Sequence, residues 1–226
     1  MSRSALGPRP WPEVPRSHVL LLVPLGSCEQ HGPHLPLDTD TRIAVAVAYG
    51  AAARCPDTVV APALAYGSSG EHAGFAGTLS IGQEALELVL VELARSSDHF
   101  AGVVLVNGHG GNVEPVGRAV ARLRAEGRAV RSWSPRLARS TDAHAGRTET
   151  ALMLAIAPDL VLLDRAEPGR TIPLQELLPA LRVGGVAAVS ANGVLGDPTG
   201  ATAAEGHAAL ADLVDHLVHV LADSEE

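Results

Sequence analysis

The chain has 226 residues, of which 46% are hydrophobic and 19% charged, and its formal net charge is -8 at pH 7. This length and apolar content suit one domain with a buried core. An acidic chain with only 3% aromatic residues lacks both the positive charge and the stacking side chains of a nucleic-acid-binding surface. Two cysteines are too few for a disulfide framework.

The first sixteen residues are rich in proline, and we expect them to form an N-terminal tail before a single domain over residues 17–226. The tail has no apolar core of the kind that a secretory signal needs. No apolar run in the chain reaches the roughly 20 residues that cross a bilayer. We therefore expect a cytoplasmic protein that does not insert into membranes.

Short apolar runs alternate with helical spacings along the first half of the chain. Residues 18–25 are almost all apolar and end at Gly26, as in a strand buried on both faces. Asp40 opens a stretch with apolar residues at helical spacing, where it can serve as N-cap or first-turn acid. The pattern predicts a helix over 40–54, a strand over 58–65 and a helix over 83–96.

The second half continues the alternation. Residues 101–106 predict a buried strand leading into a glycine-rich turn at Gly108, and a helix over 113–126 that Gly127 closes. A shorter strand over 128–133, a helix over 149–157 that Pro158 stops, and a final helix over 203–222 follow. Residues 167–200 are rich in Gly and Pro and predict long loops around one or two short elements.

This order of elements predicts an α/β fold: a single domain with a largely parallel sheet flanked by helices on both faces. Open α/β sheets place their sites at the carboxyl ends of the strands. The chemically distinctive residues fall just after a predicted strand or at a predicted helix start. We therefore expect them to converge, although more than a hundred residues separate Glu29 from Glu149.

The densest group of metal-binding residue types follows the first predicted strand: Glu29-Gln30-His31-Gly32-Pro33-His34, with Asp40 soon after. Glu29 and His31 are two residues apart, so in extended backbone their side chains leave the chain on the same side. Imidazole and carboxylate together suit zinc, iron or manganese better than calcium, and a carboxylate such as Asp40 can bridge two ions. An exposed polar loop is the alternative interpretation.

A second group, Asn107-Gly108-His109-Gly110-Gly111-Asn112, follows the strand over 101–106. The glycines on either side of His109 let the backbone come close to a metal ion or other group that His109 binds. The same turn is also compatible with an anion-binding nest of backbone N–H groups. We interpret Asn107 and Asn112 as turn and capping groups rather than catalysts.

A third group, His144-Ala145-Gly146-Arg147-Thr148-Glu149, stands at the start of the helix over 149–157. We predict that His144 is the acid/base that protonates a leaving amine. Glu149 is either a metal ligand or the carboxylate that positions the attacking water. Arg147 either pairs with a substrate carboxylate or is a solvated residue of the helix start.

The other histidines divide into two sets. His34 and His72 are candidates for contacting the substrate or supporting the metal ligands, with a structural role as the open alternative. Glu71, next to His72, is a further candidate for the same roles. Five others lack an acidic or glycine-rich context and are predicted to be structural or exposed: His18, His99, His207, His216 and His219.

With these motifs the chain resembles the creatininase family of metal-dependent amidohydrolases. The likeness covers most of the chain and extends to Tyr66-Gly67 with Glu71-His72, Gly77-Thr78-Leu79-Ser80, and Gly193 with Gly196-Asp197-Pro198. The resemblance implies a creatininase-like fold, two divalent ions per subunit and a homo-oligomer, either a hexamer or an octamer. It also implies that the ions are bound by Glu29, His31, Asp40 and His109, with Asp40 bridging.

Two positions depart from the members that hydrolyse creatinine. Those members have Tyr-Glu where this chain has Gly110-Gly111, and their glutamate is a metal ligand. Glu149 is the best replacement here, which favours ligation over water positioning. They also have a tryptophan shortly before the His-Ala-Gly motif, where this chain has Ser140 and Thr141. Creatinine is therefore not the expected substrate.

Within the family, the short chain, the Arg147-Thr148-Glu149-Thr150 variant and the Ala- and Arg-rich composition most resemble the peptidases of mycofactocin biosynthesis. That likeness implies a ribosomal precursor peptide as substrate, cleaved to release a C-terminal Val-Tyr that has been oxidatively decarboxylated. Fe²⁺ and Zn²⁺ are the favoured ions, and Mn²⁺ is compatible. The alternatives are a formamide or cyclic-amide hydrolase of the same family and, from a different class, a noncatalytic module that binds a phosphate metabolite.

Overall fold

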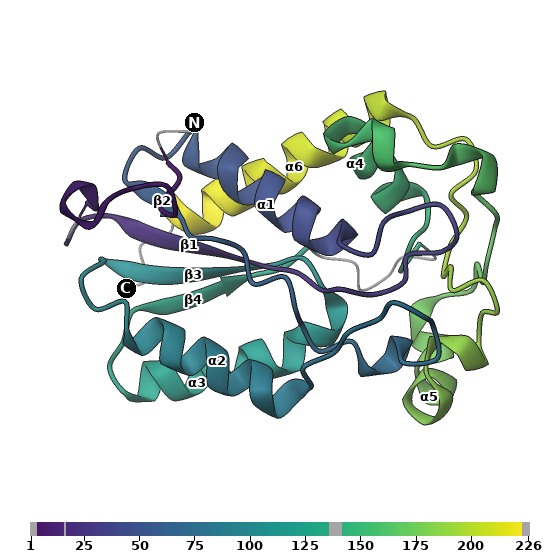
Figure 1. Cartoon of the computed structure of the whole chain (residues 1–226), viewed down its shortest axis with the longest axis horizontal. Coiled ribbons are helices and arrows are strands. Elements are labelled where there is room, and N and C mark those ends of the chain that lie inside the picture. The colour runs from purple at the N-terminus through teal and green to yellow at the C-terminus, as the bar shows by residue number, and fades with distance from the viewer. Residues whose placement is uncertain (1–3, 16, 136–141, 223–226) are drawn as a thin grey trace.

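The computed structural model describes residues 4–15, 17–135 and 142–222. In this part of the chain four parallel strands form one sheet in the order β2-β1-β3-β4. The strands are β1 (Leu20–Leu25), β2 (Thr58–Val60), β3 (Gly102–Asn107) and β4 (Val130–Trp133). Helices cover both faces of the sheet (Figure 1), which confirms the predicted α/β architecture. No helix among these residues is long and apolar enough to span a membrane.

Each face of the sheet packs against its own set of helices. Leu21, Val23 and Leu25 of β1 belong to one core cluster with residues of α2 (Gln83–Arg95) and α3 (Val113–Ala125). Leu22 belongs to a second cluster, with residues of α1 (Thr39–Ala52), α4 (Arg147–Ile156) and α6 (Ala203–Ala222). Because alternate side chains enter opposite cores, the strand sequence is almost continuously apolar.

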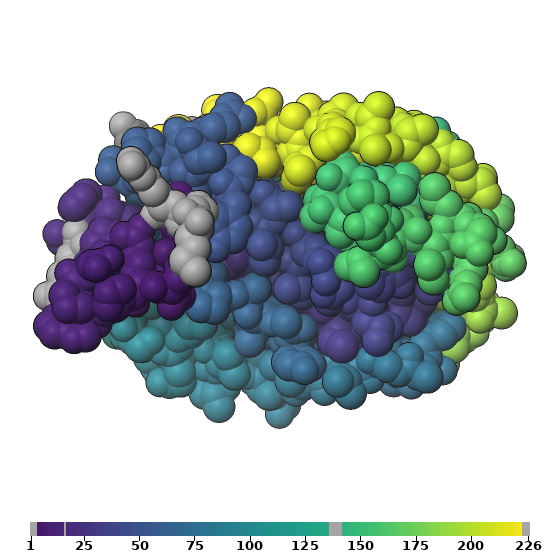
Figure 2. All heavy atoms as spheres, turned by 45° about the horizontal axis from the view of Figure 1, so that its top comes forward, coloured from purple at the N-terminus to yellow at the C-terminus, as the bar shows by residue number. Residues whose placement is uncertain are grey.

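The N-terminal segment lies along the edge of the sheet. Ala5 forms a parallel bridge with Val60 of β2, and the Leu6 N–H donates to the Val60 carbonyl. Figure 2 shows this purple segment at one end of the molecule and α6, in yellow, along its upper edge. The division between a tail over 1–16 and a domain over 17–226 stays a prediction.

All but one of the elements predicted individually have boundaries within two residues of the prediction. The exception is β2, which ends at Val60 instead of continuing to residue 65. Pro62 follows two residues later and has no N–H to extend the strand pairing. One isolated bridge, between Leu25 and Leu64, continues the alignment.

The region predicted as loops contains a longer helix than expected. Residues 167–200 include α5 (Leu174–Gly184), which forms despite Pro179 in its interior. Leu177 and Leu181 of this helix pack with Val186 and Leu195 in a third apolar cluster. The helix lies beyond the carboxyl ends of the strands (Figure 1) and contacts the Gly70–His72 turn.

Candidate metal centre

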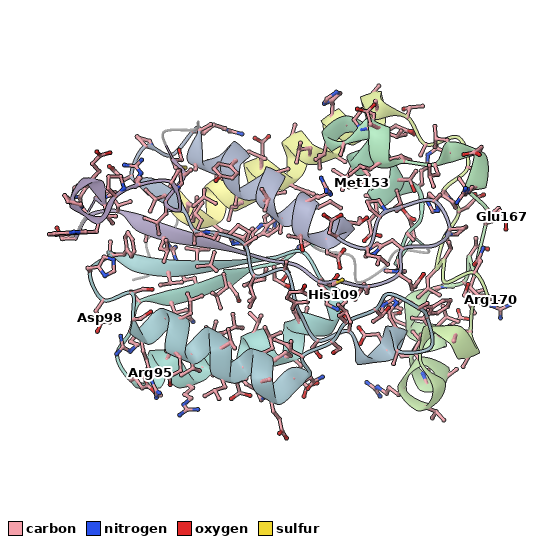
Figure 3. All side chains as sticks on the ribbon, in the orientation of Figure 1. Arg95, Asp98, His109, Met153, Glu167 and Arg170 are labelled. Carbon is pink, nitrogen blue, oxygen red and sulfur yellow. The ribbon has the colours of Figure 1, made fainter. Side chains whose placement is uncertain are left out.

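Separate parts of the chain bring polar residues to the carboxyl ends of β1 and β3. Glu29 and His31 follow β1, His109 follows β3, and Asp40 is the second residue of α1. Figure 3 shows His109 where the strands end. These four residues are each at most 4% exposed. The predicted convergence is therefore present, and an exposed loop is the wrong description of the first motif.

The carboxylate of Asp40 lies between two imidazoles. Its Oδ1 is 3.0 Å from His31 Nε2, and its Oδ2 is 3.0 Å from His109 Nδ1. Ser27 donates its hydroxyl to Oδ2 at 2.9 Å, a contact that the sequence did not indicate. Each oxygen of the Asp40 carboxylate thus faces a different imidazole. A carboxylate that bridges two metal ions would have the same arrangement.

The carboxylate of Glu29 is fully buried among three imidazoles. Its Oε2 lies 3.1 Å from His109 Nε2, and its Oε1 lies 3.3 Å from His72 Nε2 and 3.9 Å from His144 Nδ1. Neither oxygen makes a hydrogen bond with a described residue. A buried carboxylate without such partners is strongly destabilising unless a cation compensates it. The donor set therefore fits a metal ion.

Burial and charge oppose each other in the pKa values of this cluster. Burial raises the pKa of Glu29, but His109 outweighs it and holds the pKa at about 2. Burial lowers the pKa of His31, but Asp40 raises it to about 10. Burial also raises the pKa of Asp40, but His31 outweighs it and holds that pKa well below its usual range. Burial lowers the pKa of His109, but Glu29 outweighs it and raises that pKa well above its usual value. A divalent cation would take the place of the protons on these imidazoles.

Glu149 joins the cluster from the start of α4. Its Oε2 lies 4.0 Å from His31 Nε2 and accepts the Ala145 N–H at 2.6 Å. Burial raises the pKa of Glu149 to about 7. Among the residues that the structure describes, three overlapping sets each bring one ligand atom per residue within 4.8 Å of the others: Glu29-His31-Asp40, Glu29-His72-His144 and His31-His144-Glu149. With His109, which lies 3.1 Å from Glu29 and 3.0 Å from Asp40, these sets supply the candidate ligands of a two-ion centre.

His144 is held in the cluster by its backbone. Its N–H and carbonyl both pair with Leu195, and the following Ala145 has a φ of 52°. A left-handed backbone at a residue other than glycine costs about 1–3 kcal/mol and persists only where the surroundings impose it. Burial lowers the pKa of His144 well below its usual value. The imidazole is therefore neutral near pH 7 and available as a base.

His72 and Glu71 come from the short 3-10 turn Gly70–His72. Burial lowers the pKa of His72 to about 4, and this ring approaches Glu29 as described above. Glu71 Oε1 lies 3.6 Å from His109 Nε2. A side chain at Gly111 would begin 2.4 Å from that oxygen. The carboxylate of Glu71 thus uses space that the glycine at 111 leaves open.

His34 and Arg147 make their contacts elsewhere. His34 is buried next to α4, with Nε2 2.8 Å from Thr150 Oγ1. The Arg147 guanidinium binds Glu205 at 2.7 Å and the carbonyls of Thr199 and Gly200 at 2.9 Å. It thus ties α4 to α6. The structure does not bring Arg147 to the cluster, so its pairing with a substrate carboxylate gains no support.

The remaining polar predictions have clear outcomes. Asn107 accepts the His109 N–H at 3.2 Å, and Asn112 donates to the Gly26 carbonyl at 3.0 Å, so both are turn groups as predicted. Of the five histidines predicted to be structural or exposed, His216 accepts the Trp133 Nε1–H and the other four are exposed. Ser140 and Thr141 lie outside the described residues.

Gln30 is the residue that sequence reasoning missed. A side chain between Glu29 and His31 in extended backbone points away from both of theirs. Its amide nitrogen nevertheless lies 2.9 Å from His72 Nδ1 and 3.1 Å from His144 Nε2. Its position inside the densest motif was the only available signal.

Buried carboxylates and imidazoles arranged in this way define a candidate metal-dependent hydrolase. The sequence model of the creatininase family, described as creatinine amidohydrolase, matches residues 9–221. The chain belongs to the creatininase family. It is accordingly a hydrolase that acts on amide bonds and binds divalent metal, and the phosphate-binding module is set aside.

Two curated relatives have the name mycofactocin precursor peptide peptidase. The protein of Mycobacterium ulcerans is 54% identical over 98% of this chain and 89% of its own length. That of Mycolicibacterium smegmatis is 59% identical over 87% of this chain and 81% of its own length.

Two solved creatininase structures share the fold. A mutant of the zinc–zinc type has a TM-score of 0.77 at 26% identity and covers 98% of both chains. A manganese creatininase has a TM-score of 0.76 at 29% identity and covers 97% of this chain and 98% of its own.

Proposed function

We propose that this chain is the peptidase that cleaves the modified mycofactocin precursor peptide and releases its C-terminal, oxidatively decarboxylated Val-Tyr. The relatives with that name, at 54% and 59% identity, support the choice of substrate. The fully buried Glu29 carboxylate, without a hydrogen bond from any described residue, is the observation that carries the metal-dependent chemistry.

In this proposal five residues would hold two divalent ions: Glu29, His31, Asp40, His109 and Glu149. When bound, the ions activate water and polarise the carbonyl of the scissile amide. Fe²⁺ and Zn²⁺ are the favoured ions, and Mn²⁺ suits the same mixture of imidazole and carboxylate. The zinc–zinc and manganese forms of the related creatininases agree with this range.

His144 moves the proton. Its Nδ1 lies 3.9 Å from Glu29 Oε1, on the side of the ring that faces the cluster. As the water oxygen bonds to the carbonyl carbon, Nδ1 accepts the proton that the water loses. It returns that proton to the amide nitrogen as the C–N bond breaks, so the amine leaves neutral and the new terminal carboxyl group keeps the second proton of the water, which then passes to the released amine.

The test is hydrolysis of the decarboxylated precursor peptide, followed by mass spectrometry, with iron-loaded, zinc-loaded and metal-stripped protein side by side. We expect release of the two-residue fragment only when metal is present. Binding of about two metal equivalents without cleavage would redirect the proposal to a formamide or cyclic-amide hydrolase of the same family.

We further propose a homo-oligomer, a hexamer or an octamer, that works in the cytoplasm. Light scattering of the purified protein tests the assembly, and a monomer at working concentration would contradict it.

A further inference from the structure

The side-chain amide of Gln30 connects four groups of the candidate site. Its Oε1 accepts the Gly32 N–H at 2.9 Å, and its Nε2 donates to the Gly193 carbonyl at 3.1 Å. The same Nε2 faces His72 Nδ1 and His144 Nε2 at the distances given above. Gln30 is only 6% exposed, so water does not substitute freely for these partners.

Two backbone groups fix which end of the amide points where. If oxygen and nitrogen were exchanged, the oxygen would face the Gly193 carbonyl and the NH₂ would face the Gly32 N–H. Two acceptors would then face each other at Gly193 and two donors at Gly32. Only the observed orientation of the amide lets both backbone groups form hydrogen bonds. Gly193 comes this close because it lacks a side chain and has a φ of 78°, whereas a Cβ there would lie 1.9 Å from Gln30 Oε1.

The backbone carbonyl and the side-chain amide of Gln30 then determine where the hydrogens of the two imidazoles lie. His144 Nε2 lies 2.8 Å from the backbone carbonyl of Gln30, which only accepts. In neutral His144 the hydrogen is therefore on Nε2, and that nitrogen cannot accept from the amide. The two amide hydrogens have two acceptors left, the Gly193 carbonyl and His72 Nδ1, so every group is satisfied.

We propose that Gln30 is a positioning residue: its backbone carbonyl keeps the His144 hydrogen on Nε2 and leaves Nδ1 bare toward the cluster, and its side-chain amide places the His72 hydrogen on Nε2. His72 then turns a hydrogen rather than a lone pair toward Glu29 Oε1, across an ion-pair contact of 3.3 Å that is not a hydrogen bond. His144 Nδ1, 3.9 Å from the same oxygen, has the free lone pair that a base needs. The consequence for turnover rests on the proposed function, but the tautomers do not.

The test is ¹⁵N solid-state NMR of the full chain with ring-labelled histidine, at neutral pH, in which protonated and bare ring nitrogens resonate far apart. His72→Asn and His144→Asn spectra identify the two rings. We expect the hydrogen on Nε2 of both His72 and His144. A hydrogen on Nδ1 of either neutral ring in the unsubstituted protein would overturn the proposal, without reference to any substrate.

Gln30→Glu removes the donor while keeping the shape of the side chain. A carboxylate at this position can only accept, so His72 Nδ1 must gain a hydrogen. Gln83→Glu, at the exposed start of α2, is the matched control and should leave both rings unchanged. An unaltered His72 Nδ1 in folded Gln30→Glu would contradict the proposal.

Activity provides the second readout. With zinc content equal to that of the unsubstituted protein, Gln30→Glu should lower kcat for the precursor peptide at least tenfold, while Gln83→Glu should not. Equal kcat would show that the tautomers do not control turnover. Failure of the unsubstituted protein to cleave the peptide would instead count against the proposed function and leave the tautomer result intact.

Discussion

Charged side chains are buried at one end of the sheet and exposed to solvent at the other. At the carboxyl ends of the strands, Glu29 and Asp40 are buried and each lies within 3.3 Å of two imidazoles. Beyond the amino ends, Arg95 and Arg128 pair with Glu126 and Asp98 in contact with solvent. Figure 3 shows His109 at one end and Arg95 with Asp98 at the other.

The residue types at each end, rather than the volume of a cavity, indicate where the site lies. A cavity of about 510 Å³ lies at the amino ends of the strands, lined by Leu20, Gly102 and Val130 and by Arg124 and Arg131. No acidic or histidine side chain lines it. Exposed ion pairs are screened by water and gain little, whereas buried carboxylates are retained only with compensating charge. We therefore place the proposed reaction at the carboxyl ends of the strands.

The largest expected effect comes from removing the shared carboxylate. Asp40→Ala should abolish cleavage and weaken metal binding by more than the roughly 10- to 100-fold that loss of an outer hydrogen-bond partner costs. Elemental analysis after dialysis measures the metal. Asp98→Ala, at the other end of the sheet, is the matched control. Equal metal content in both variants would break the contrast between the two ends.

His144→Ala should separate turnover from metal binding. If His144 only moves protons, the variant keeps its metal and loses about 10²–10⁴-fold in kcat. Peptide turnover and metal content, measured on the same preparation, check this. Loss of metal would make His144 a ligand, as its place in two of the three candidate sets allows.

Glu71→Gln tests the carboxylate beside Gly111. If Glu71 orients the His109 ring, the variant should bind Zn²⁺ roughly 10-fold more weakly, as expected for an outer partner of a ligand. Competition with a chelating dye measures the affinity. Glu114→Gln, at the exposed start of α3, should bind Zn²⁺ as tightly as the unsubstituted protein does. If the Glu71 and Glu114 variants agree, Glu71 has no such role.

The smallest effect belongs to the amino end. Arg128→Ala removes a partner of exposed Asp98, whose side chain is 71% exposed, and should lower the free energy of unfolding by less than about 1 kcal/mol. Urea unfolding with and without added salt measures it. A loss of several kcal/mol, or of bound metal, would mean that the two ends are coupled.

The sequence predicts most of this architecture because its patterns are local. The apolar run of β1 and the helical spacing in α3 place both elements within two residues. The helix α5 was not predicted because Pro179 lies in its interior. Leu177 of this helix packs in one apolar cluster with Leu195. That packing is a tertiary contact that no window of sequence contains.

The site also contains residues that the sequence predicts and residues whose place depends on tertiary contacts. Glu29, His31, Asp40 and His109 were predictable as a group because parallel strands end at one edge of the sheet. The role of Gln30 was not, since its amide meets Gly193 across 163 positions of the chain. The place of Glu71 depends similarly on the empty space at Gly111.

The most direct test of the central claim is anomalous diffraction from crystals grown with ZnCl₂, recorded on both sides of the zinc absorption edge. We expect two zinc peaks per chain, one on each side of Asp40, among the side chains of Glu29, His31, Asp40, His109 and Glu149. Absence of zinc from this cluster, or zinc only at the amino ends of the strands, would contradict it.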